Sequence, residues 1–364
     1  MKKLLASTIL AVVPTTAFAA DKINVVTSFS ILNDITANIG GDLITLNTIV
    51  PAGADAHVFQ PTPETARLVA GADLLLMNGI GFEGWMERLE EASGFEGTSI
   101  VVTSAVDVLE NEEEHEGHGD DDHDDHADHD DHADHDDHAD HDDHDDHDDH
   151  EEETAAKDDD HDHDHAEETA AKDHDDHGDD HAGHDHGAFD PHAWQDVDNV
   201  ILYAEAVAAG LAAADPSNAA AYEANLATYR TQLAALDTEI MEILSVIPEG
   251  DRTVITSHDA FGYFAAAYDL DFDAPQGMST EVEPSAKDIA ELIEEIREEN
   301  IRAVFVENIT NPQFIEQIAA ETDAVVGGSL YSDALTPAGG PASTYIDMMR
   351  HNATTLATAL SGTN

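Results

Sequence analysis

The stretch from Pro216 to Pro248, "PSNAAAYEANLATYRTQLAALDTEIMEILSVIP", decides the fold. It has proline near each end and alanine and leucine throughout, which predicts one uninterrupted helix. About 30 helical residues would span roughly 45 Å at 1.5 Å per residue, which is longer than a crossover helix needs. We therefore expect residues 216–248 to form a rigid helix that links two lobes, with a cleft between the lobes.

Strand and helix patterns alternate on both sides of this helix. Strand–helix repetition implies parallel sheets that are covered on both faces, so we expect an α/β protein with two (β/α)4-type lobes. The first lobe is predicted at 21–215 and the second at 249–364. Short apolar and β-branched runs predict strands at 23–30, 43–50, 73–79, 98–104, 253–257, 270–275, 302–308 and 324–330.

The charge of the chain excludes several classes of partner. The 364 residues include 80 acidic and 13 basic side chains, which gives a formal net charge of −67. DNA, RNA and anionic membrane surfaces would all repel such a chain, so we expect no nucleic-acid partner. Cationic partners are favoured instead.

The first residues, "MKKLLASTILAVVPTTAFAA", predict a signal peptide at 1–20. Two lysines precede an apolar run, and small residues follow at the positions that a signal peptidase reads. The chain contains no cysteine, so it can form no disulfide and offers no lipid-anchoring thiol after the signal. No later run approaches about 18 uninterrupted apolar residues. We expect a soluble periplasmic protein, with secretion beyond the cell as the alternative.

Residues 111–187 differ in composition from the rest of the chain. They contain 20 of the 24 histidines, 38 acidic residues and two lysines, with repeats such as "HADHDDHADHDDH" from His126 to His138. Almost no side chain there is apolar and larger than alanine, so we expect a disordered insertion. Flexible histidines among carboxylates predict many weak metal positions, which would raise the local metal concentration; a solvated segment with no metal role is the alternative. The histidines concerned are His115, His118, His123, His126, His129, His132, His135, His138, His141, His144, His147, His150, His161, His163, His165, His174, His177, His181, His184 and His186.

Outside the insertion only four histidines remain, and three of them are candidates for one site. His57 follows the second predicted strand, His192 follows the insertion, and His258 ends the first strand of the second lobe. Functional groups in open α/β sheets gather beyond the carboxyl ends of strands. Asp333 follows the last predicted strand and is the fourth candidate. His351 lies within the terminal helical pattern without a matching partner, so we expect an ordinary structural role for it.

Six motifs in order carry a resemblance to a known family. They are "GADAHVFQPTPET", "DPHAW", "SHDAFGYF", "EVEPSAKDIAEL", "VFVENITNPQFIEQIA" and "LYSDAL". With the insertion excepted, the chain from about residue 22 to its end resembles the metal-binding solute receptors of bacterial ABC importers, the ZnuA/AztC/TroA-like cluster. The resemblance implies two lobes that are linked by one long helix and hold a metal ion between them.

The resemblance also implies particular ligands. Carried over by motif, these are His57, His192, His258 and Asp333. Zinc receptors of the family often carry a histidine- and acid-rich loop before the "DPH" motif, where this insertion lies. Some have a disulfide in the second lobe, which this chain cannot form. Some lack the late aspartate, so Asp333 is the ligand that the resemblance implies least strongly.

The ligand types favour zinc over manganese. Three imidazole nitrogens and one carboxylate oxygen suit tetrahedral Zn²⁺, whereas Mn²⁺ prefers more oxygen ligands. Manganese receptors of the family typically have glutamate where this chain has His258. Copper would bind more tightly than zinc at most nitrogen sites, so metal availability must contribute to selectivity.

The sequence therefore predicts a receptor that captures Zn²⁺ in the periplasm and delivers it to the membrane permease of an ABC importer. A periplasmic zinc metallochaperone is a further candidate partner, and we expect a monomer. Four protein ligands leave no position for an activated water, which argues against a metallohydrolase that would use Asp259 or Glu281 as base. Two alternatives remain: a manganese or broad divalent-metal receptor, and a zinc buffer that acts through the insertion.

Overall fold

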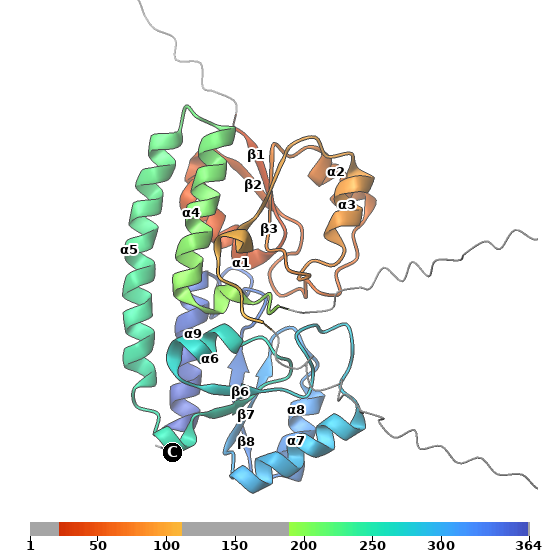
Figure 1. Ribbon diagram of the computed structural model, residues 1–364, viewed down its shortest axis with the longest axis vertical. Coiled ribbons are helices and arrows are strands. Elements are labelled where there is room, and N and C mark those ends of the chain that lie inside the picture. The colour runs from red at the N-terminus through yellow and green to blue at the C-terminus, as the bar shows by residue number, and fades with distance from the viewer. Residues whose placement is uncertain (1–21, 111–188, 363–364) are drawn as a thin grey trace, which may run out of the picture. The chain divides into compact units, whose positions relative to one another are not determined.

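The computed structural model describes residues 22–110 and 189–362. The predicted signal peptide and the predicted insertion at 111–187 lie outside these residues. The described residues belong to one compact unit, which contains two sheets of four parallel strands (Figure 1). The expected α/β fold with two parallel-sheet lobes is therefore confirmed.

The first sheet has the strand order β2-β1-β3-β4. Its central strand β3, with sequence LLLM, is buried at every position, as expected for a parallel strand covered on both faces. Figure 1 shows α2 and α3 on one side of this sheet and α1 and α4 on the other. The strands are β1 (Asn24–Thr27), β2 (Thr45–Thr48), β3 (Leu74–Met77) and β4 (Thr98–Val101), and the first three helices are α1 (Ser30–Gly40), α2 (Pro63–Ala70) and α3 (Met86–Ser93).

The second sheet repeats this arrangement with the order β6-β5-β7-β8. Helices α7 and α8 lie together, while α9 lies beside α5 (Figure 1). A capping box of Ser285 and Asp288 starts α7, and Asn300 ends it in the left-handed conformation. The elements are β5 (Thr253–Ile255), α6 (Gly262–Tyr268), β6 (Asp271–Asp273), α7 (Ala286–Glu299), β7 (Ala303–Glu307), α8 (Gln313–Glu321), β8 (Val325–Leu330) and α9 (Tyr345–Leu360).

The long helix α5 runs from Ala219 to Leu244, so it is shorter than the range 216–248 that the sequence suggested. Asp215 explains the later start, because its carboxylate accepts hydrogen bonds from Ser217 Oγ at 2.6 Å and from the Asn218 side chain at 2.5 Å. These contacts form a turn before the helix. The 26 residues of α5 span roughly 39 Å.

Helix α4 (Val197–Ala214) precedes α5 and was not recognised as a separate element in the sequence. It packs along α5, as Figure 1 shows, so the linking helix is not a lone strut. Among the described helices, α4 alone is long and apolar enough to cross a membrane. Its residues Val200, Tyr203, Val207 and Leu211 are fully buried, which is the pattern of a core helix.

One hydrophobic core extends through both halves of the described chain. It contains residues of the first sheet, of α1, α4, α5 and α9, and of the α6 region. A smaller, separate core lies under α7 and α8. The helices α4, α5 and α9 therefore connect the two sheets through continuous packing rather than through a flexible joint.

Candidate metal centre

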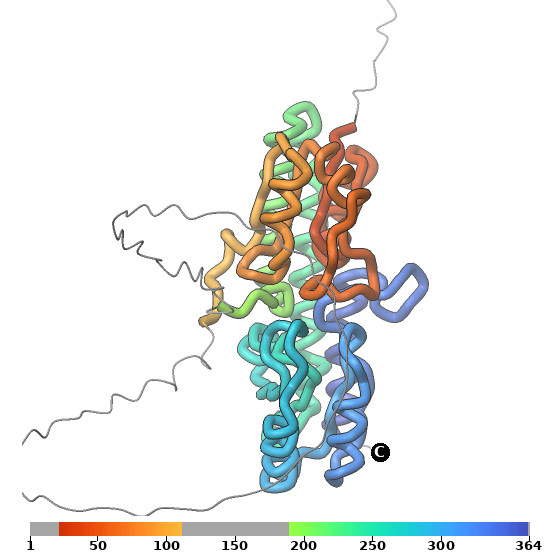
Figure 2. Tube along the Cα trace, turned by 90° about the vertical axis from the view of Figure 1, so that its right-hand side faces the viewer, coloured from red at the N-terminus to blue at the C-terminus, as the bar shows by residue number. Residues whose placement is uncertain are grey.

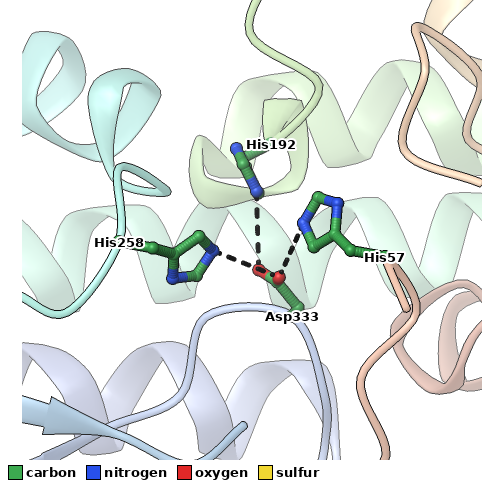
Figure 3. A group of neighbouring side chains, drawn as sticks. All are labelled: His57, His192, His258 and Asp333. Atoms are coloured by element: carbon green, nitrogen blue, oxygen red, sulfur yellow. Dashed lines mark ion pairs between the residues drawn. The ribbon is translucent and has the colours of Figure 1, made fainter. Parts of the chain in front are cut away.

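Four segments that are far apart in the sequence bring His57, His192, His258 and Asp333 together (Figure 3). His57 lies in the loop between β2 and α2, and His192 immediately precedes the short 3₁₀ helix η4 (Ala193–Gln195). His258 follows β5, and Asp333 follows β8. All four side chains are buried, and one ligand atom from each lies within 4.8 Å of the others. Among the described residues, no other group of this kind is found.

The distances between the ligand atoms suit a four-coordinate ion. The Nε2 atoms of His57 and His258 lie 3.2 and 3.3 Å from Asp333 Oδ2, and that of His192 lies 3.7 Å from Asp333 Oδ1. The four ligand atoms all lie within 4.8 Å of one another. One ion between them could therefore reach all four side chains, through one or both oxygens of Asp333.

The ligand atoms are buried without hydrogen-bond partners among residues 22–110 and 189–362. The three Nε2 atoms and both oxygens of Asp333 are inaccessible to solvent and lack a partner with hydrogen-bond geometry there. Leaving such groups unsatisfied is costly, on the order of 1–3 kcal/mol each. A bound cation would satisfy all of them at once, which makes a metal centre the simplest explanation of the cluster.

A carboxylate orients His192 from behind. Asp190 Oδ1 accepts a hydrogen bond from the His192 backbone N–H at 2.8 Å and lies 2.7 Å from its Nδ1. Tyr263 holds this segment from α6, because its hydroxyl donates to the Asp190 carbonyl at 3.0 Å. With Nδ1 protonated and facing Asp190, Nε2 keeps its lone pair for a metal ion.

Glu307 has the same role for His258. Its Oε1 accepts from the backbone N–H groups of Ser257 and His258, both at 2.8 Å. Its Oε2 lies 2.7 Å from His258 Nδ1. Glu307 ends β7, the strand beside β5, so the parallel sheet itself places this carboxylate behind the histidine.

His57 is held by its own loop and by an aromatic wall. Its backbone N–H donates to Asp55 Oδ1 at 2.8 Å, and its ring meets that of Phe82 edge to face, with centroids 4.8 Å apart. The other oxygen of Asp55 accepts from Thr280 Oγ1 at 2.6 Å. Since Thr280 belongs to the loop after β6, this bond joins the two halves of the chain beside His57.

Residues of the first lobe also hold the segment that carries Asp333. Trp194 Nε1 and Gln195 Nε2 both donate to the Ser332 carbonyl, at 2.9 and 2.8 Å. Two residues beyond Asp333, the Leu335 backbone N–H donates to Ser30 Oγ at 3.0 Å. The carboxylate is therefore positioned from both sides by contacts within the protein.

The charges of the cluster interact strongly. Burial alone lowers the pKa of His192, but the carboxylates of Asp333 and Asp190 outweigh it and raise that pKa. Burial opposes protonation of His258 as well, yet Glu307 and Asp333 raise its pKa well above the usual value. Burial raises the pKa of Asp333, but His258 and His192 lower it further, to well below its ordinary value. A metal ion must therefore compete with protons that the site itself attracts.

Sequence reasoning missed the two orienting carboxylates. Asp190 stands two residues before His192 in "FDPHAW", and Glu307 is a buried charge at the end of the apolar strand "AVFVE". A charged residue at the end of a buried strand was the available signal. Its partner could not be identified without knowing which strands are neighbours.

The other candidate residues lie elsewhere. His351 is on α9, where its Nε2 lies 3.0 Å from the Ser329 carbonyl, in keeping with a structural role. Glu281, considered as a base for hydrolysis, is exposed to solvent. The histidines from His115 to His186 lie outside the described residues, so their expected metal positions stay a prediction.

The chain matches one protein family and is similar to metal-binding proteins of other bacteria. Residues 25–359 match the family described as ZnuA, zinc-uptake complex component A periplasmic. The "Manganese-binding lipoprotein MntA" of Halalkalibacterium halodurans is 28% identical over 339 residues, which are 93% of this chain and 89% of the relative. The "Metal ABC transporter substrate-binding lipoprotein FimA" of Streptococcus parasanguinis is 29% identical over 349 residues, 94% of this chain and 91% of its own.

Solved structures share the fold. The periplasmic zinc-binding protein TroA from Treponema pallidum superimposes with a TM-score of 0.70 at 24% identity, covering 93% of this chain and 99% of its own. A manganese-bound periplasmic metal-binding protein from Candidatus Liberibacter asiaticus gives a TM-score of 0.67 at 25% identity, covering 93% and 100%. Both likenesses extend over nearly the whole of each chain.

Proposed function

The chain belongs to the ZnuA family of metal-binding receptors of ABC transporters, and on this premise we propose that it captures Zn²⁺ and delivers it to the permease of a zinc importer. As a member of this family it is a receptor rather than an enzyme, and its partner is a membrane permease. The export that its lipoprotein relatives share agrees with a location outside the cytoplasm. We propose the periplasm in particular, and a monomer.

The convergence of three Nε2 atoms and one carboxylate is the observation that carries the proposal. Nitrogen-rich sets of four ligands are typical of zinc, and the four ligand atoms lie within 4.8 Å of one another, so one ion can reach them all. His57, His192, His258 and Asp333 are the proposed ligands. Because all four come from the protein, the ion is held as cargo and no coordination position is reserved for catalysis.

Manganese is the second candidate cargo. Several relatives carry manganese in their names, among them MntA and the PsaA proteins of streptococci, and three matching solved structures of the protein from Candidatus Liberibacter asiaticus are manganese-bound. Asp333 could bind through both oxygens and so offer Mn²⁺ a further oxygen ligand. A nitrogen majority still favours Zn²⁺ over Mn²⁺ at any site of this kind.

A zinc buffer that acts through residues 111–187 is the alternative from another class. The 20 histidines of that segment support a role in collecting zinc. A periplasmic zinc metallochaperone, which would supply the receptor, is a proposed additional partner.

Metal titration of the chain with and without residues 111–187 tests the receptor against both alternatives. We expect one tight zinc per molecule after the deletion, and a much weaker competition by Mn²⁺ than by an equal concentration of Zn²⁺. Replacing His57, His192 or His258 by alanine should weaken zinc binding more than roughly 100-fold, which is the upper range for loss of a group that merely orients a ligand. Asp333→Ala should weaken it less, and His351→Ala is the matched control. Tight binding that disappears with the deletion would support the buffer, and Mn²⁺ that displaces Zn²⁺ at equal concentration would support the manganese receptor.

A further inference from the structure

A pocket of about 370 Å³ lies between α1 and the loop that follows Asp333. Its walls come from α1, from the end of β2 and the residues after it, and from residues 335–343. Figure 2 shows the loop after β8 projecting beside the N-terminal segments. The pocket is separate from the metal centre, since none of the four proposed ligands lines it.

Asp34 is the only charged residue among those that line the pocket. One of its oxygens accepts from the Tyr345 backbone N–H at 2.9 Å, at the start of α9, and lies 3.5 Å from the Asn38 amide. The lining contains no lysine or arginine. Burial, opposed by the bond from Tyr345 and assisted by nearby Asp347, raises the pKa of Asp34 to about 6. Asp34 is therefore mostly ionised at neutral pH without a cation beside it in the pocket.

The internal contacts of Asp34 are hydrogen bonds from neutral groups, the Tyr345 backbone N–H and the Asn38 amide, and no cation lines the pocket. Asparagine could accept the same bond from Tyr345 without the cost of desolvating a charge. The negative charge itself therefore has no cationic partner in the pocket and no step of metal binding uses it, which points to an external cation as its partner.

We propose that this pocket receives a lysine or arginine side chain of a protein partner, with Asp34 as its counter-ion. The volume far exceeds that of a bare ion and suits one long side chain. Ala37, Pro51, Leu335 and Pro337 provide apolar surface for the aliphatic stem, and Asp34 lies ready for the charged end. The strongly acidic chain also favours a cationic partner.

The position of the pocket suggests which partner would use it. The Leu335 N–H bonds to Ser30, and the Leu335 carbonyl accepts from the Gly53 N–H at 2.8 Å. A side chain inserted beside Leu335 would press on the segment that begins at Asp333 and on the loop that leads to His57. The partner that takes the metal would thereby touch both halves of the site; this assignment of the partner rests on the receptor function proposed above.

The probe is N-acetyl-arginine amide, which carries one guanidinium and no other charge, added to the zinc-loaded full chain. Its neutral isostere, N-acetyl-citrulline amide, is the control ligand. Backbone amide signals of Ala37 and Gly339 report the pocket by nuclear magnetic resonance, so attraction to acids elsewhere does not interfere. We expect saturable shifts at these amides with the arginine probe and none with the citrulline probe. Asp34→Asn should weaken the binding at least tenfold, whereas Asp42→Asn, an exposed acid outside the pocket, should leave it unchanged.

A second variant, Ala37→Leu, fills the pocket without altering Asp34 and should also abolish the shifts. Equal binding to the parent and Asp34→Asn, equal binding of the citrulline probe, or the same shifts with KCl at equal concentration would each overturn the proposal. Zinc affinity of the variants, measured separately, should stay within about twofold of the parent. A chain that binds the arginine probe but no zinc would retain the pocket and reject the receptor function.

Discussion

His192 and His258 direct Nε2 toward Asp333 because a carboxylate occupies the opposite side of each ring. The pairs Asp190–His192 and Glu307–His258 have nitrogen–oxygen distances of 2.7 Å each. These carboxylates fix the ring orientation, select the tautomer with a free Nε2 lone pair, and make the imidazole a stronger donor. No such carboxylate faces the ring of His57 among the described contacts. Its backbone N–H donates to Asp55 and its ring packs against Phe82, so its orientation depends more on packing.

Replacing either carboxylate by its amide tests this role at the residue scale. In Glu307→Gln, the amide oxygen can keep the bonds from the Ser257 and His258 backbone N–H groups while the N–H₂ faces Nδ1 and donates to it, which places the imidazole proton on Nε2 where the metal should bind. In Asp190→Asn the single oxygen that accepts from both the backbone N–H and Nδ1 can be kept, so only the loss of the negative charge is tested. We expect zinc affinity to fall about 10- to 100-fold in Glu307→Gln and less in Asp190→Asn. Chelator competition measures this, with the exposed Asp198→Asn as control and circular dichroism to confirm folding. A zinc affinity of Glu307→Gln within twofold of the parent would show that Glu307 does not select the tautomer of His258.

Asp34 gives a pH-dependent prediction at the same scale. Its pKa is raised from 3.8 to about 6, so the folded protein holds this proton more tightly than the unfolded chain does. The resulting stability is fully present below about pH 3.8 and is lost as pH rises through about 6. We expect Asp34→Asn to be more stable than the parent by about 1–3 kcal/mol at pH 7.5, and about equally stable at pH 4. Urea unfolding of the zinc-free proteins at both pH values measures the difference; an asparagine variant that is less stable at pH 7.5 would contradict it.

At the scale of elements, the eight strands could be predicted because most of them are short apolar or β-branched runs between turn signals, although β2 (TLNT) and β6 (DFD) are mainly polar. Buried parallel strands such as β3 and β7 have little polar interruption, so their pattern is clear without knowledge of their neighbours. Helix α4 was missed because it is apolar around most of its circumference and lies between the insertion and a proline-led helix. Such a helix has no distinct polar face from which its period could be read.

The candidate ligands could be predicted and the groups behind them could not. His57, His258 and Asp333 follow predicted strands, and parallel sheets gather such positions at one edge. Glu307 ends β7 and contacts His258, which follows the neighbouring strand β5. Asp55, next to His57, is held by Thr280 from the loop after β6 in the second lobe. These relations depend on strand order and on packing between the two lobes, which local sequence patterns do not contain.

The packing of α4, α5 and α9 makes a further prediction about motion. These helices share one core with the first sheet and α6, and Tyr222, Tyr229 and Leu233 of α5 are buried in it. Wide closure would break this packing, so metal capture should involve small loop movements instead. Small-angle scattering of the chain without residues 111–187 should give nearly superimposable curves with and without zinc. A clear contraction on loading would mean that the helices allow the two halves to rotate.

At the scale of the whole molecule, two kinds of metal position are expected in one chain. The four proposed ligands are buried and held by bonds from both halves, so they lose little freedom when an ion binds. The 20 histidines of residues 111–187 stand among 38 acidic residues with hardly any apolar side chains, so each metal position there must be assembled at a cost in conformational entropy. Numerous weak positions beside one strong position would form a graded supply of zinc.

Acidification should separate these two kinds of position. Imidazole binds zinc only when it is neutral, and nearby carboxylates raise histidine pKa values, as they do for His192 and His258. The zinc affinity of both kinds of position must therefore fall as the pH falls. The cluster of His57, His192, His258 and Asp333 should start from much tighter binding than the positions in residues 111–187. As pH falls from about 7 toward 5.5, the full-length protein should first release several equivalents of zinc and only later a final single equivalent. A zinc-sensitive dye measures the release: deleting 111–187 should remove the early phase, and His192→Ala should remove the late one. A single phase that the deletion leaves unchanged would mean that the insertion holds no zinc.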